Sequence, residues 1–227
     1  MGIAARLIDM AEAALLTEAE VAAVEGVGDD FVRVELVAPA FRDAKWAAGA
    51  KVQIRPPGGG RGLRTFTPTS WDVGEGRTSL LAYLHGDGPA SAWFRQVRGG
   101  ERVRLMGPRR SIDPPAAGES VLFVGDATSV ALAGAFETTG AALTCLFEAE
   151  RPAALEGLRP GAEVCEPAAL LDRLRAAGAG MAGPYRLVVT GNAATVHAVR
   201  REIRTWSAPP AKVTGKAYWA AGRTGLD

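Results

Sequence analysis

The stretch TSLLAYLHGDGPASAWFRQVRGGERVRLMGPRRS, residues 78–111, decides the fold of the first half of the chain. Residues 80–84 form a short apolar run that is typical of a strand. A glycine-rich turn follows, and Pro89 fixes φ at the start of a helix predicted over residues 90–97. Residues 101–106 return as a strand in which apolar and basic side chains alternate. A strand, a glycine-rich turn and a helix N-terminus together present free backbone N–H groups to an anion.

A second signal lies upstream, in Arg64, Thr65, Phe66 and Thr67. On an extended chain Arg64 and Phe66 share one face, where the guanidinium can bind a phosphate and the ring can stack on a flat cofactor. Thr67 can hydrogen-bond the edge of such a ring. An ordinary amphipathic strand would carry the same residues, so the prediction of a dinucleotide-like cofactor depends on this strand and the glycine-rich turn together.

In these motifs the sequence resembles the siderophore-interacting, FAD-binding proteins, a branch of the ferredoxin-reductase-like flavoenzymes. That family carries R-x-Y-T, then H-G-x-x-G-P-A-S-x-W, then G-D-x-L-x-L-x-G-P. This chain reads RTFT, HGDGPASAW and GERVRLMGP in the same order. Its end, KAYWAAGRTGL, is similar to the family's G-Y-W-x-x-G tail, and the resemblance runs from about residue 22 to the C-terminus.

The resemblance implies a flavin-dependent oxidoreductase that reduces ferric siderophores. Electrons from NAD(P)H, or from a small electron-transfer protein, would pass through FAD to chelated Fe(III). The residues expected to bind FAD are Arg64, Thr65, Phe66, Thr67, Leu84, His85, Gly88, Pro89, Ala90 and Ser91. The chain has only two histidines, without metal-ligand spacing, so no protein-ligated metal is expected. Two alternatives stay open: another ferredoxin- or flavodoxin-type reductase on the same scaffold, and a protein that binds flavin or siderophore without turnover.

The pattern of elements predicts two domains. Residues 1–112 are expected to form a flavin-binding antiparallel β-barrel that begins with a helix over residues 3–16 and includes alternating strands over residues 31–37 and 50–55. The proline pair at 114–115 indicates a linker. Residues 119–227 are expected to form a doubly wound α/β domain with a parallel sheet, because strand and helix patterns alternate there. The predicted strands are 120–124, 143–147 and 185–190, and the predicted helices are 130–138, 168–177 and 193–206.

Ligands of doubly wound sheets bind beyond the carboxyl ends of the strands. By resemblance, Asp126, Ala127, Thr128 and Asn192 occupy the turns that bind NAD(P)H. The family reads G-D-E-T and A-G-E there, whereas this chain has GDAT and TGN, so Ala127 and Asn192 each replace a carboxylate. The choice of electron donor therefore stays open.

The aromatic tail gives a further prediction. Trp219 is expected near the second face of the flavin or near the nicotinamide site, because an ordered aromatic tail needs something to pack against. The alternative is that Tyr218 and Trp219 close the core of the second domain.

The amino-acid composition excludes some classes of binding partner and indicates a compartment. The chain has 227 residues, 48% of them hydrophobic and 22% charged, with a net charge of +1, so no global field would recruit nucleic acid. No apolar run reaches the roughly 20 residues needed to span a bilayer. Cys145 and Cys165 lack CxxC spacing and are expected to be buried free thiols. These features predict a cytoplasmic protein.

An anionic ferric chelate would need local positive charge. Arg109 and Arg110 follow a Gly-Pro turn, and the tail holds further cations, Lys212, Lys216 and Arg223. We predict a basic substrate rim from Arg109, Arg110, Lys216 and Arg223, since clustered cations raise the local concentration of an anion. The alternative is that these are solvated surface charges.

Overall fold

The computed structural model describes residues 16–58 and 62–222. The chain divides into two compact units, each with its own core: Met1–Gly26 with Val32–Ser111, and Val27–Phe31 with Ile112–Asp227. The helix predicted over residues 3–16 lies outside the described residues, except for its last residue, which is not helical.

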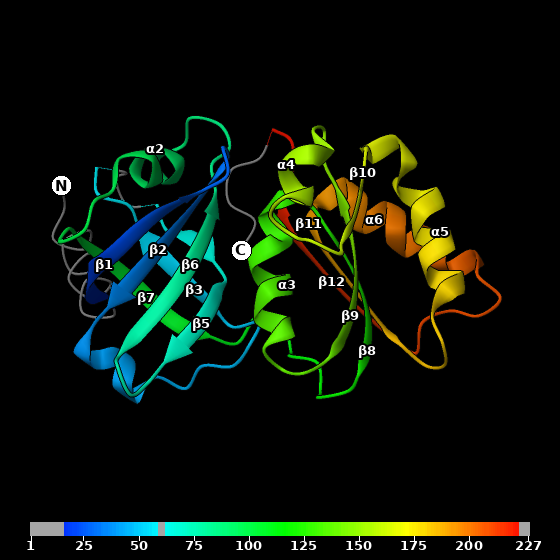
Figure 1. The fold of residues 1–227 in the computed structure, drawn as a ribbon, viewed down its shortest axis with the longest axis horizontal. Helices are drawn as coiled ribbons and strands as arrows, with labels where there is room; N and C mark the ends of the chain where they lie inside the picture. Colours follow the sequence, from blue (N-terminus) through cyan, green and yellow to red (C-terminus); the bar gives the residue numbers. More distant parts are fainter. Residues whose placement is uncertain (1–15, 59–61, 223–227) are drawn as a thin grey trace, which may run out of the picture. The chain divides into compact units, whose positions relative to one another are not determined.

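The first unit is an antiparallel barrel (Figure 1). Its strands are β1 (Thr17–Val27), β2 (Phe31–Val37), β3 (Lys51–Arg55), β4 (Arg64–Phe66), β5 (Pro68–Asp72), β6 (Arg77–Tyr83) and β7 (Arg102–Arg109). The strand order is β4-β3-β7-β1-β2-β6-β5. The two strands at the ends of this order are consecutive in the chain and separated only by Thr67. One bent segment therefore pairs with β3 on one side and with β6 on the other, which closes the barrel.

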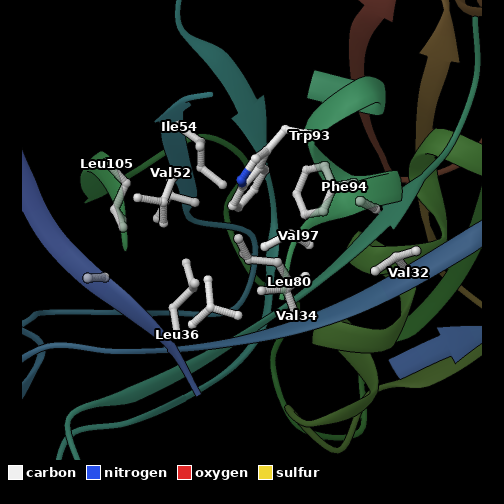
Figure 2. Close-up of a cluster of buried hydrophobic side chains, with 14 of the residues drawn as sticks. Val32, Val34, Leu36, Val52, Ile54, Leu80, Trp93, Phe94, Val97 and Leu105 are labelled. Atoms are coloured by element: carbon white, nitrogen blue, oxygen red, sulfur yellow. The ribbon is translucent and has the colours of Figure 1, made fainter. Parts of the chain in front are cut away.

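Alternation along the strands fills the barrel (Figure 2). Val34 and Leu36 of β2 are fully buried, as are Val52 and Ile54 of β3, because side chains two residues apart point to the same face. A short helix, α2 (Pro89–Gln96), adds Trp93 and Phe94 to the same cluster. The single-turn helix η1 (Pro39–Asp43) completes this unit.

The second unit is a parallel five-stranded sheet. Its strands are β8 (Ser120–Gly125), β9 (Ala142–Glu148), β10 (Glu163–Cys165), β11 (Arg186–Asn192) and β12 (Lys212–Trp219). Its helices are α3 (Val130–Glu137), α4 (Pro152–Glu156), α5 (Leu170–Gly180) and α6 (Ala193–Glu202), with single turns at Ala127–Ser129, Pro167–Ala169 and Ile203–Thr205. The strand order is β10-β9-β8-β11-β12, and every pair is parallel.

Helices cover both faces of this sheet. Leu122 of β8 packs in a buried cluster with Leu174 of α5 and Val199 of α6. The next residue, Phe123, points to the opposite face, where its ring lies 6.2 Å from that of Phe136 in α3. The predicted fold class, an antiparallel flavin-type barrel followed by a doubly wound parallel sheet, is confirmed.

Five elements have no counterpart in the predicted list: β1, β5, β10, α4 and β12. The most consequential is β12, because the segment expected to be an ordered aromatic tail is an edge strand of the second sheet. Among the described residues, no helix is long and apolar enough to cross a membrane.

Candidate functional site

A buried hydrogen bond holds the turn before α2 on its inner side, and the outer side of the turn is exposed to solvent. Gly88 is the N-cap residue of α2 and Pro89 is its first helical residue, and both are exposed. Ser91, by contrast, is buried, and its hydroxyl donates a hydrogen bond to the carbonyl of His85 at 2.8 Å. The first N–H groups of a helix have no acceptor within it, so this N-terminus is suited to an anion.

Arg95 braces the same turn from the far end of the helix. Its Nη2 donates to the carbonyl oxygen of Gly86 at 2.9 Å, and its Nη1 lies 3.8 Å from the carboxylate of Asp87. The ring of His85 stacks on Tyr83 with 5.5 Å between centroids. The sequence motif pointed to the turn but not to Arg95, whose role follows only from the path of the chain.

The RTFT segment lies against this helix. Phe66 contacts Phe94 of α2 edge to face, with 5.0 Å between ring centroids. Arg64 is two residues earlier on the same face of β4, and its Nη1 donates to the carbonyl of Leu63 at 2.9 Å. The structure therefore brings together the two motifs that the sequence assigned to one cofactor.

The remaining predicted flavin residues surround this contact. Thr65 is exposed on the opposite face of β4, Thr67 occupies the break between β4 and β5, and Leu84 packs against the barrel core. A guanidinium and a helix N-terminus can hold one pyrophosphate from two sides. The half-buried ring of Phe66 leaves part of its surface for a flat ring. The residues present fit FAD.

In the second unit, Asp126 joins three strand ends. Its Oδ1 accepts hydrogen bonds from the backbone N–H of Thr128, at 2.9 Å, and from the Thr128 hydroxyl. Its Oδ2 accepts from the backbone N–H of Asn192, at 2.9 Å, and from the indole N–H of Trp219, at 2.7 Å. Asp126 follows β8, Asn192 ends β11 and Trp219 ends β12, so one carboxylate ties the carboxyl ends of three neighbouring strands.

The backbone at position 191 passes so close to Asp126 that only glycine fits there. Gly191 has φ of +109°, and a Cβ there would lie 2.3 Å from Oδ2 of Asp126. Beside it, the hydroxyl of Thr190 donates to the hydroxyl of Ser129 at 2.8 Å, and both side chains are buried. This edge of the sheet therefore carries a cluster of polar side chains that hydrogen-bond one another and the backbone.

The two departures from the family pattern lie at this edge. Asn192 caps α6, because its side-chain oxygen accepts from the N–H of Ala194 at 3.0 Å. Asparagine caps a helix about as well as an acid does. Ala127 is half-buried in the single turn after β8 and forms no equivalent contact among the described residues. The substitution at 192 therefore keeps the local structure while removing a charge.

Trp219 lies at the same edge, at 37% exposure, and is not part of the described hydrophobic cluster of this sheet. This exposure does not fit a core-closing role for Trp219, and its place near a nicotinamide stays a prediction. Its distance from a flavin stays a prediction.

Sequence reasoning missed Glu148, the last residue of β9, which is only 9% exposed. Burial raises the pKa of this carboxyl group above its usual value, the hydrogen bond from Thr195 lowers it, and the nearby charges of Asp126 and Glu150 raise it further. An acid that ends a largely apolar strand is the signal that could have found it.

The predicted basic rim is divided between the two units. Arg109 donates from Nη2 to the side-chain oxygen of Gln53 on the barrel, and Arg110 follows it, exposed. Lys216 lies within β12, opposite Thr190. Lys212 is four residues earlier on that strand, about 13 Å away in an extended chain. Arg223 lies outside the described residues.

An antiparallel barrel followed by a parallel sheet of this order defines the ferredoxin-reductase-like class. Phthalate dioxygenase reductase has the same fold: the match covers 93% of this chain and 71% of that one, at 16% identity and a TM-score of 0.73. A siderophore utilization protein from T. fusca matches over 93% of this chain and 95% of its own length, at 21% identity and a TM-score of 0.74.

Within that class, residues 10–112 match the siderophore-interacting FAD-binding domain. The resemblance that the motifs indicated is therefore confirmed for this part of the chain. The mycobactin import ATP-binding/permease protein IrtA of Mycobacterium tuberculosis is 33% identical over 113 residues, which are 46% of this chain. The chain spans only 13% of the length of that relative.

Proposed function

We propose that the chain is a FAD-dependent reductase of ferric siderophores. Electrons from NAD(P)H, or from a small reduced redox protein, would pass to chelated Fe(III) and release the iron as Fe(II). The observation that carries this proposal is the contact between Phe66 and Phe94, at 5.0 Å, inside a stretch that matches a siderophore-interacting FAD-binding domain. That contact joins the phosphate-seeking Arg64 to the glycine-rich turn of α2.

The electron count supports a flavin between donor and iron. When bound, FAD accepts the two electrons of a hydride and can release them singly, which two Fe(III) ions require. The chain's own part is to hold and orient. Arg64 and the N-terminus of α2 would bind the pyrophosphate, Phe66 would contact the isoalloxazine, and Thr67 would hydrogen-bond its edge. The iron keeps its ligands from the siderophore, so no protein ligand to the metal is needed.

The proposed substrate class rests on the basic residues of the chain and on the names of two similar proteins. IrtA is named for mycobactin import, and the T. fusca protein for siderophore utilization. Many ferric siderophores are anions, and we propose that Arg109, Arg110, Lys216 and Arg223 raise their local concentration. We place the reaction in the cytoplasm. The free, buried thiols of Cys145 and Cys165 are compatible with such a reducing compartment.

Flavin content and single-turnover reduction test the proposal. The purified chain should show a flavin absorption spectrum, bleach anaerobically with NADH or NADPH, and regain its colour on addition of a ferric hydroxamate. A ferrous-specific chromogenic chelator should then report two Fe(II) per flavin. Flavin that bleaches but is not reoxidised by ferric chelates would contradict the proposal and favour another reductase on this scaffold. Flavin that no donor reduces, chemical reductants included, would favour a binding protein.

The basic rim is tested in the same assay. Arg110→Glu should slow reduction of an anionic ferric chelate and leave a neutral chelate nearly unaffected. The difference should shrink at high salt, because salt screens exposed charges. Equal rates for both chelates in the variant, at low and high salt, would remove this arginine from the mechanism.

A further inference from the structure

One buried carboxylate has no role in the proposed chemistry. Glu148 ends β9, the neighbour of β8 in the parallel sheet, and is nine-tenths buried. Its Oε1 accepts a hydrogen bond of 2.6 Å from the hydroxyl of Thr195, in the first turn of α6. The side chain therefore lies at the carboxyl edge of the sheet, on the same side as the turn after β8.

Glu148 differs from Asp126 in its hydrogen bonding. Asp126 accepts four hydrogen bonds. Within the part of the chain that the structure describes, Thr195 is the one donor to Glu148, and Oε2 of Glu148 accepts none. Oε2 is not among the fully buried atoms that lack a partner, so it keeps contact with solvent and is open to a ligand. A carboxylate left in this state gains from a ligand that brings further hydroxyl donors to it.

The fold indicates which ligand does so. Glu148 stands 23 residues after Gly125, at the end of the second strand of a sheet in the order 3-2-1-4-5. Dinucleotides lie across the switch point of such sheets, here between β8 and β11. An acid about 20 residues after the glycine turn then hydrogen-bonds the ribose 2′-hydroxyl. The vicinal hydroxyls of an adenosine ribose are two adjacent donors, and they match the unfilled oxygen.

The same place is unsuited to a 2′-phosphate. Asp126 and Glu150 add negative charge around Glu148. No described lysine or arginine forms an ion pair with Glu148, and both of the charges that act on it are negative. Arg173, which lies near Cys165 opposite Glu148 in the sheet, is paired with Glu163 at 3.5 Å. Specificity of this kind combines an attraction for one ligand with a repulsion of its competitor.

We infer that Glu148 makes the second domain select a dinucleotide with a free ribose 2′-hydroxyl. The electron donor is then NADH rather than NADPH. Thr195 is a positioning residue that orients the carboxylate. The inference rests on the proposed function only in taking a nicotinamide dinucleotide as the donor.

Binding of nucleotide fragments to the full chain tests the inference without turnover. By isothermal titration calorimetry, 5′-AMP should bind at least tenfold more tightly than adenosine 2′,5′-bisphosphate. Glu148→Gln keeps the shape and the acceptor for Thr195 but removes the charge. It should weaken 5′-AMP, strengthen the bisphosphate, and reduce the preference at least fivefold. Glu148→Asp keeps the charge and should still reject the bisphosphate.

Glu156→Gln is the matched control, because it removes a carboxylate at an exposed position that is not among the charges acting on Glu148. It should change the preference by less than twofold. Equal affinities in the unchanged protein, tighter binding of the bisphosphate, or binding of neither fragment at millimolar concentration would each overturn the inference. Chemically reduced flavin that still delivers electrons to a ferric chelate would leave the proposed function standing in all three cases.

Discussion

At the scale of single residues, we expect Arg64 to contribute directly to the affinity for FAD. Replacing it with alanine removes a charge-assisted hydrogen bond to the pyrophosphate, which contributes about 1.5–3 kcal/mol. Arg64→Ala should therefore bind FAD at least about tenfold more weakly, as measured by flavin fluorescence on titration. Arg33→Ala, which removes an exposed arginine paired with Glu25, is the control and should leave the affinity unchanged. Unchanged affinity in Arg64→Ala, or FMN in place of FAD by mass spectrometry, would contradict the assignment.

Gly191 gives a second prediction at this scale. A methyl group there would meet the Asp126 carboxylate and would also be held at a positive φ. Gly191→Ala should lower the free energy of unfolding by more than about 2 kcal/mol, because both a steric clash and an unfavourable backbone conformation are introduced. Gly183 has φ of +72° with nothing within 4 Å, so Gly183→Ala isolates the backbone cost, about 1 kcal/mol. Equal losses in the two variants would show that the approach to Asp126 is not tight.

The buried carboxyl group of Glu148 predicts a pH dependence. Its pKa is raised in the folded chain, mainly by burial, so protons bind the folded state more tightly than the unfolded one. The contribution of Glu148 to stability is therefore full below its unfolded pKa, near 4.5, and is lost as the pH rises through the folded value. Relative to Glu148→Gln, the unchanged protein should lose stability as the pH is raised from 4 to 8. A constant difference in urea unfolding across that range would refute this.

At the scale of elements, α2 depends on a side chain at its own far end. Arg95→Met removes the hydrogen bond to the Gly86 carbonyl while keeping the length of the side chain. The turn should loosen and FAD should bind about three- to tenfold more weakly, a loss in the range of one hydrogen bond. The melting temperature should change little, because Arg95 is exposed. Arg98→Met, an exposed arginine just after the helix, should alter neither quantity. A large loss of stability without a change in flavin affinity would assign Arg95 a purely structural role.

Helices and strands whose apolar residues follow a regular pattern were predictable from the sequence. The apolar β8 and β11, the alternating β2 and β3, and the proline-started α2 all lie within a few residues of their predicted ranges. β1 was missed because its sequence, TEAEVAAVEGV, is rich in alanine and glutamate, which favour helix. Pairing with β7 decides its structure, since Glu18 faces Arg104 and Glu20 faces Arg102 across the sheet. Such long-range pairing overrides local propensity.

The candidate site was predictable where a motif carries it. RTFT and HGDGPAS were found because each residue type has its own chemistry at a fixed spacing. Arg95, Glu148 and Thr195 were not found, because their roles depend on which strand ends and helix ends become neighbours. The bond between Asp126 and Trp219 joins residues 93 positions apart, and no local pattern indicates it.

At the scale of the whole molecule, one buried arginine fixes the start of the second unit. Arg186 is 2% exposed, and its Nη2 donates to the carbonyl of Asp113 at 2.8 Å and to the hydroxyl of Thr214 at 3.1 Å. Arg186→Met would break two hydrogen bonds from a charged donor, each of which contributes about 1.5–3 kcal/mol. Urea unfolding of the full chain should lose about 3 kcal/mol, whereas Arg201→Met, at an exposed position of α6, should lose almost nothing. Equal stability of the two variants would mean that water replaces the guanidinium.

The two sheets differ in how they end, and this bears on self-association. In the barrel the two end strands, β4 and β5, continue one another across Thr67, whereas the parallel sheet ends at β10 and at β12. β10 is only three residues long, but β12 has eight and exposes Val213. An open edge of that length is a template for pairing with a second chain, and lysines on edge strands oppose such pairing. Lys212 and Lys216, spaced along β12, therefore have a second explanation: they keep copies of this protein from joining edge to edge into aggregates.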